Sequence, residues 1–159
     1  MGSPAPTPGP AGATARQRDP ARRPRGRTVI YCDSSALVKL VVDEPESDAL
    51  EAWLATQPDD TPLVSSVLAR TEVVRAVSRY GHEWTDAAKE LLKSVAVVEL
   101  DAVLADDAAQ FEPPELRSLD ALHLASALRL GQALTAFVAY DLRLTDAARA
   151  HGLPVNSPE

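Results

Sequence analysis

The chain has 159 residues, enough for one domain of ordinary size with a single core and too few for two cores. It carries 16 basic and 23 acidic residues, and this acidic balance argues against a binder that relies on a broad basic surface for phosphate contact. Cys32 is the only cysteine, which excludes an intrachain disulfide and a thiolate zinc cluster and makes a reducing cytoplasm the expected setting.

The first 27 residues differ in composition from the rest. They hold six of the 13 prolines, four of the seven glycines and six of the 16 basic residues. Such a stretch buries too little apolar surface to offset its ordering entropy, so we predict a disordered Pro/Arg-rich tail over residues 1–27. A wrongly chosen start codon or a leader without function are the alternatives. The predicted tail lacks the apolar segment of a secretory signal peptide, so we do not expect it to be one.

Residues 28–159 are predicted to form the one folded domain. They carry 10 basic and 22 acidic side chains, a net charge of about −12. Such an acidic body suits a basic protein partner. It also remains compatible with a nuclease, because bound cations invert the local field of an acidic site.

The predicted elements alternate between strands and helices. In chain order we predict a strand at 29–32, helices at 36–42 and 47–56, a strand at 63–65, helices at 67–80 and 85–93, a strand at 95–100, helices at 101–111 and 119–130, a strand at 136–140, a helix at 145–150 and an edge strand at Val155. Ser34 or Ser35, Asp101 and Ser118 are the expected helix caps. This order predicts an α/β fold, a three-layer α/β/α sandwich with a mostly parallel central sheet. No run approaches 18 apolar residues, so no membrane span is expected.

Four acidic residues occupy positions where a metal site would need them. Asp33 and Asp141 follow predicted strands directly, while Glu72 and Asp120 interrupt apolar helical patterns. In parallel sheets, ligands bind outside the carboxyl ends of the strands. Two carboxylates about 4 Å apart repel by roughly 4 kcal/mol at an effective dielectric constant near 20, so a cluster of them would call for a cation. Oxygen ligands favour Mg²⁺, or Mn²⁺, over zinc.

Each acid also has an ordinary structural explanation. Asp33 could cap the following helix, although the two serines beside it could do the same and leave its carboxylate free. Glu72 could be a solvated helix residue, and Asp120 an anion favoured by a helix N-terminus. Asp141 could be a turn residue, with Asp146 the better candidate for a helix cap. If folding brings the four together, the expected chemistry is metal-dependent hydrolysis of a nucleic-acid phosphodiester.

Other polar residues near these acids are weaker candidates. His123 follows Asp120 by one helical turn and is either a structural helix residue or a group that supports the metal ligands. Four arginines flank the acids and are candidates for phosphate contact or simply solvated side chains: Arg70, Arg75, Arg117 and Arg143.

The chain resembles the PIN-domain ribonucleases, and among them the VapC toxins of type II toxin–antitoxin pairs. Four segments carry the resemblance, which extends over about 28–156: IYCDSSALVKL (30–40), LARTEV (68–73), LDALHLASA (119–127) and YDLRL (140–144). One departure is visible, because many relatives have Thr or Ser where this chain has Ala139; Ser35 could supply the missing hydroxyl.

The resemblance implies a Rossmann-like PIN domain in which Asp33, Glu72, Asp120 and Asp141 hold one or two Mg²⁺ ions and act as the catalytic residues. It implies an endoribonuclease toxin that cleaves RNA and is inhibited by a cognate antitoxin, a small DNA-binding protein. Whether the chain forms a homodimer is left open.

Two other functions stay as alternatives. A non-catalytic PIN-fold interaction module would keep the fold and the partner surface alone. A haloacid dehalogenase-like phosphatase also places an aspartate after its first strand, but it needs a second aspartate where this chain has Ser35.

Overall fold

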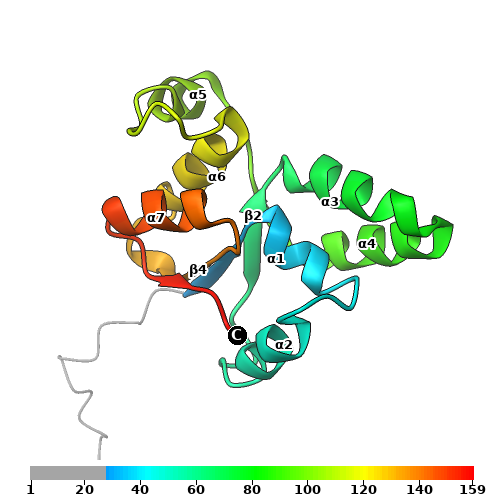
Figure 1. Cartoon of the computed structure of the whole chain (residues 1–159). Helices are drawn as coiled ribbons and strands as arrows, with labels where there is room; N and C mark the ends of the chain where they lie inside the picture. Colours follow the sequence, from blue (N-terminus) through cyan, green and yellow to red (C-terminus); the bar gives the residue numbers. More distant parts are fainter. Residues whose placement is uncertain (1–27) are drawn as a thin grey trace, which may run out of the picture.

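A computed structural model describes residues 28–159 of the chain (Figure 1). The predicted tail at 1–27 lies outside the described residues. The elements are β1 (Val29–Cys32), α1 (Ser34–Lys39), α2 (Ser47–Leu54), β2 (Leu63–Ser66), α3 (Ala69–Val77), η1 (Ser78–Tyr80), α4 (His82–Ser94), β3 (Ala96–Val98), α5 (Ala102–Ala108), α6 (Ser118–Leu128), η2 (Gly131–Ala133), β4 (Leu134–Val138), α7 (Leu142–Ala150) and β5 (Val155–Asn156).

The five strands form one sheet in the order β3-β2-β1-β4-β5, and all of its neighbouring strands are parallel. The predicted α/β class with a mostly parallel sheet is therefore confirmed. β1 lies at the centre, where the chain first builds toward β3 and later returns on the other side with β4. This reversal of strand order between β1 and β4 is a switch point, the usual place for a ligand in an open α/β sheet.

Helices cover both faces of the sheet, as Figure 1 shows. Alternate residues of β1 point to opposite faces because the side-chain period of a strand is two. Ile30 and Cys32 join the core beneath α1, α3 and α4, whereas Tyr31 packs with residues of α6 and α7 on the other side. The central strand is thus buried on both faces, and the molecule has three layers.

Three of the expected helix caps are wrong. Asp33 caps α1, with its side chain accepting a hydrogen bond from the Ala36 N–H, so the serines do not take that role. α6 begins without a side-chain cap at Arg117. Asp141, in extended backbone geometry, caps α7, while Asp146 lies inside that helix. The Asp101 cap of α5 is confirmed.

Within residues 28–159, no helix combines the length and apolar character that crossing a membrane requires.

Candidate active site

The four predicted acids all lie where a helix begins. Asp33 and Asp141 are the caps of α1 and α7, and Glu72 and Asp120 are in the first turns of α3 and α6. α1, α3 and α7 each follow a strand of the parallel sheet, so they begin at its carboxyl edge. The partial positive charge of a helix N-terminus favours an anion at each of these positions.

Asp33 is the most enclosed of the four, with only 5% of its surface exposed. Its Oδ1 accepts hydrogen bonds from Ser35 Oγ at 2.6 Å and from the Ala36 N–H at 3.0 Å. Burial raises the pKa of this carboxyl, and the nearby Glu72 carboxylate raises it further, although His123 and the two donors act in the opposite direction. The second oxygen receives no hydrogen bond from residues 28–159 and is available to a ligand.

The hydrogen bonds that Glu72 makes with Ser34 and His123 all involve one of its carboxylate oxygens, Oε2. This oxygen accepts from Ser34 Oγ at 2.5 Å and lies 2.7 Å from His123 Nε2. Burial raises the pKa of Glu72, but the hydrogen bonds from His123 and Ser34 outweigh burial and bring the pKa below its ordinary value. Glu72 is therefore a carboxylate held in its charged form, and its Oε1 accepts no hydrogen bond from the described residues.

Asp120 has the opposite environment. Its Oδ2 is buried and has no hydrogen-bond partner among residues 28–159. Burial raises the pKa of Asp120 and the Asp141 carboxylate raises it further, while Arg117 and His123 lower it and Glu72 adds a smaller increase. A buried carboxylate oxygen without a partner is costly, and a bound cation would supply the missing interaction.

Asp141 repeats the pattern of Asp33. Its Oδ1 accepts from the backbone N–H groups of Arg143 at 2.9 Å and Leu144 at 3.1 Å. The other oxygen again has no partner among the described residues.

The four acids interact electrostatically. The Glu72 carboxylate raises the pKa of both Asp33 and Asp120, and the Asp141 carboxylate raises the pKa of Asp120. However, no three His, Cys, Asp or Glu side chains of residues 28–159 are close enough together to form a ready cage for one ion. Mg²⁺ is usually held by one or two carboxylates and several waters, so this open arrangement of oxygen donors fits Mg²⁺ better than it fits zinc. The four acids thus influence one another electrostatically, but residues 28–159 form no closed cluster around one ion, and their convergence on a metal stays a prediction.

Three residues of this region were not identified from the sequence as parts of a site: Ser34, Tyr31 and Ser66. Ser34, considered only as a helix cap, instead donates to Glu72. Tyr31 hydrogen-bonds His123 at 2.7 Å and receives the Ser66 N–H at 3.1 Å. The available signal was a polar atom in an apolar segment, because a buried tyrosine hydroxyl needs a partner.

Ser35 supplies the hydroxyl that Ala139 cannot. Its Oγ donates to Asp33 and accepts the Tyr140 N–H at 3.0 Å, so it joins the start of α1 to the backbone that follows β4. Ala139 itself is fully buried. The contact to Asp33 agrees with the expectation that Ser35 compensates for this departure from the family pattern.

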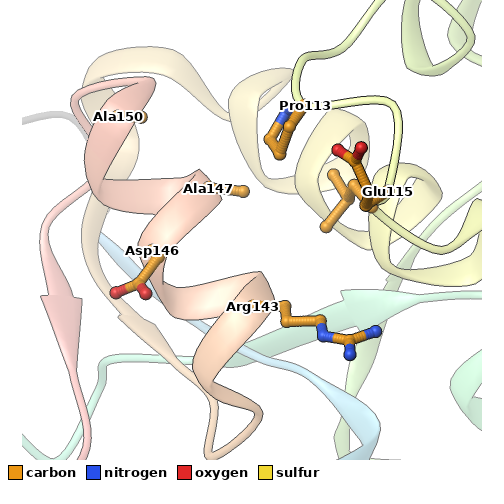
Figure 2. A pocket seen from close by; sticks show the side chains of 7 residues that line it. Pro113, Glu115, Arg143, Asp146, Ala147 and Ala150 are labelled. Carbon is orange, nitrogen blue, oxygen red and sulfur yellow. The ribbon is translucent and has the colours of Figure 1, made fainter.

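The four candidate arginines are all exposed. Arg117 is close enough to Asp120 to lower the pKa of that carboxyl. Arg143 lines a cavity of about 320 Å³ between the loop at Pro113 and Glu115 and the side of α7, and Figure 2 shows its side chain extending away from that helix. None of the four acids lines this cavity, but Arg143 borders both it and the cap formed by Asp141.

Comparisons with known proteins agree with this architecture. The family model described as PIN domain matches residues 30–150. Ribonuclease VapC46 of Mycobacterium tuberculosis (strain ATCC 25618 / H37Rv) is 46% identical over 129 residues, which cover 81% of this chain and 97% of that protein. Ribonuclease VapC47 of Mycobacterium tuberculosis (strain CDC 1551 / Oshkosh) is 41% identical over 132 residues, covering 82% and 97%.

Solved structures share the fold at lower identity. The crystal structure of the Sarcin-Ricin loop cleaving toxin VapC20 of Mycobacterium tuberculosis matches with a TM-score of 0.63 and 20% identity, over 78% of this chain and 95% of that one. A toxin–antitoxin complex from Klebsiella pneumoniae contains a chain that matches with a TM-score of 0.59 and 17% identity, over 82% and 98%. The chain therefore belongs to the PIN-domain family and is a homologue of the VapC ribonucleases.

Proposed function

We propose that the protein is a Mg²⁺-dependent endoribonuclease, with Mn²⁺ as an alternative ion, in which Asp33, Glu72, Asp120 and Asp141 hold the metal. One observation carries the assignment of the site. Among residues 28–159, Asp33, Glu72 and Asp141 each have one carboxylate oxygen fixed by protein donors and the other without a hydrogen-bond partner, while Asp120 has a buried oxygen with no partner.

The residues of the chain would act mainly by positioning. When bound, Mg²⁺ supplies a lower pKa for an attacking water and offsets the negative charge that develops at phosphorus. Ser35 and Ser34 hold Asp33 and Glu72 in fixed orientations. Because water and not the 2′-hydroxyl would be the nucleophile, the products should carry a 5′-phosphate and a 3′-hydroxyl.

The relatives support a toxin role, with an antitoxin as the protein partner. An acidic body of about −12 favours a basic partner segment, and a basic side chain offered to the four acids would compete with the metal. We expect the protein to act in the cytoplasm, where RNA is available. Membership of the PIN family removes the haloacid dehalogenase alternative.

The test is cleavage of structured and unstructured RNA by the purified chain, with Mg²⁺ or with EDTA. We expect cleavage in Mg²⁺ that EDTA stops, and loss of cleavage in Asp120→Asn. Asp146→Asn is the matched control, because this exposed acid on α7 pairs with Arg149 outside the group of four. Cleavage that persists in Asp120→Asn, or that ignores EDTA, would contradict the assignment. RNA binding without cleavage by the wild type would favour the non-catalytic alternative.

A further inference from the structure

The buried histidine of α6 links the two helical layers at the edge of the sheet. His123 is 2% exposed, and both of its ring nitrogens have partners. Nδ1 is 2.7 Å from the Tyr31 hydroxyl and Nε2 is 2.7 Å from Glu72 Oε2. Tyr31 belongs to β1 and Glu72 to α3, so a single side chain connects the centre of the sheet to the helix on its opposite face.

The direction of these hydrogen bonds follows from the Glu72 carboxylate, which can only accept. A proton on Nε2 of His123 therefore faces Glu72, and with that tautomer Nδ1 accepts the proton of the Tyr31 hydroxyl. The Ser66 N–H can only donate, and it donates to the Tyr31 oxygen at 3.1 Å. Tyr31 is itself fixed, because it is fully buried and stacks on Phe137 with ring centroids 5.3 Å apart.

The chain of donors ends on one oxygen of Glu72. Both His123 Nε2 and Ser34 Oγ reach Oε2, while residues 28–159 donate no hydrogen bond to Oε1. A glutamate has three side-chain torsions, and a free one would lose this freedom whenever it bound an ion. Donors that immobilise one oxygen in advance remove that cost and direct the other oxygen toward the site.

We propose that His123 is a positioning residue that holds Glu72 for metal binding, with Tyr31 and the Ser66 N–H fixing the orientation of the imidazole. The proposal rests on the proposed function, since it assumes that Glu72 is a ligand. It assigns to His123 no contact with RNA and no proton transfer. Groups that orient the ligands of a metal typically change its affinity by about 10- to 100-fold when they are removed.

The experiment measures Mn²⁺ affinity by the loss of the free-ion signal in electron paramagnetic resonance, so it needs no cleavage. We expect His123→Ala to weaken binding by about 10- to 100-fold. His123→Gln should recover most of the affinity, because its amide can still donate to Glu72. His151→Gln is the matched control: that histidine hydrogen-bonds the Ala147 carbonyl on α7, and its replacement should leave Mn²⁺ affinity unchanged.

A double-mutant cycle separates positioning from general structural damage. If His123 acts through Glu72, adding His123→Ala to Glu72→Ala should produce no further loss of Mn²⁺ affinity. An equal loss in both backgrounds would overturn the positioning role and leave the metal site intact as a proposal. Should His123→Ala fail to fold, Tyr31→Phe replaces it in the same cycle, with a smaller loss expected. Absence of Mn²⁺ binding by the wild type would overturn both proposals.

Discussion

At the residue scale, Asp33 and Asp141 use one carboxylate oxygen to cap a helix, which leaves the other oxygen for the proposed metal. The Oδ1 atoms of Asp33 and Asp141 cap helices, and the opposite oxygens accept no hydrogen bond from the part of the chain that the structure describes. The sequence identified these residues because they follow strands or interrupt apolar helical patterns. It treated capping and ligation as alternatives, whereas a carboxylate with two oxygens performs one role without giving up the other.

The raised pKa of Asp120 leads to a prediction on stability. An acid whose folded pKa is raised contributes stability that is fully present below its unfolded pKa, about 3.9, and is lost as pH rises through the folded value. The pKa of Asp120 is raised by burial and by Asp141. We therefore expect Asp120→Asn to be more stable than the wild type in EDTA, by a margin that grows from about pH 4 toward neutrality.

Mg²⁺ should reverse this order, because an ion that binds only the folded wild type stabilises it by mass action. Denaturant unfolding of both proteins over a pH series, with EDTA and with Mg²⁺, measures the two margins. A margin in EDTA that does not change with pH would show that the environment of Asp120 does not perturb its ionisation.

Ser35 offers a second prediction at this scale. Replacing it with alanine removes the donor to Asp33 and leaves the Tyr140 N–H without its acceptor. We expect the free energy of unfolding to fall by about 1–3 kcal/mol in EDTA, the cost of leaving a partly buried polar group without its hydrogen-bond partner. Ser94→Ala, which removes an exposed hydroxyl bonded within α4, is the control and should change little. Equal stability of the two variants would contradict the bridging role.

At the element scale, hydrophobic periodicity placed the predicted helices and strands, but several of their ends are different in the structure. β4 runs from Leu134 to Val138 and not from 136 to 140, because Leu134 pairs with Val29 of β1 through an irregular register. α4 begins directly after Gly81, whose φ of 127° interrupts the helical backbone geometry between η1 and α4. Such ends depend on tertiary pairing and backbone geometry, which local patterns do not encode.

The cap of α7 separates the structural role of Asp141 from its proposed role in chemistry. Asparagine caps a helix about as well as aspartate, so Asp141→Asn should retain stability, whereas Asp141→Ala should lose about 1 kcal/mol. Both changes remove a charged ligand and should abolish RNA cleavage. Denaturant unfolding and a cleavage assay on the two variants measure the two effects independently.

Asp101 provides the control for this pair, since it caps α5 through the Leu104 N–H and does not belong to the group of four acids. Asp101→Ala should lower the melting temperature and leave cleavage intact. Full activity of Asp141→Asn would exclude the Asp141 charge from the site.

At the scale of the whole molecule, the folded body brings together residues that are distant in sequence. His123 and Tyr31 are 92 positions apart, and His123 and Glu72 are 51 apart. Both contacts depend on the packing of α6, which lies against Tyr31 of β1 and brings His123 to Glu72 at the start of α3. The set of acids could therefore be predicted from their order along the chain, whereas the hydrogen bonds that support them required the assembled fold.

The charge of the body restricts where RNA can be held. Residues 28–159 have only 10 basic side chains against 22 acidic ones, so only a few arginines can contact the phosphates of RNA. Arg117 is close enough to Asp120 to lower the pKa of that carboxyl, and Arg143 follows Asp141, the cap of α7, by two residues. These two are the best placed to hold the backbone of a substrate beside the four acids.

We accordingly expect Arg117→Gln and Arg143→Gln to raise the KM for RNA with little change in kcat, because each removes a phosphate contact and not a metal ligand. Each should also reduce the salt dependence of binding by about one unit of slope. Arg149→Gln is the control, since Arg149 is engaged by Asp146 at 3.1 Å on the same helix as Arg143. Cleavage kinetics at several salt concentrations give both quantities. A similar rise in KM for Arg149→Gln would mean that overall charge governs RNA binding, whereas an effect confined to the other two places the substrate along the edge from α6 to α7.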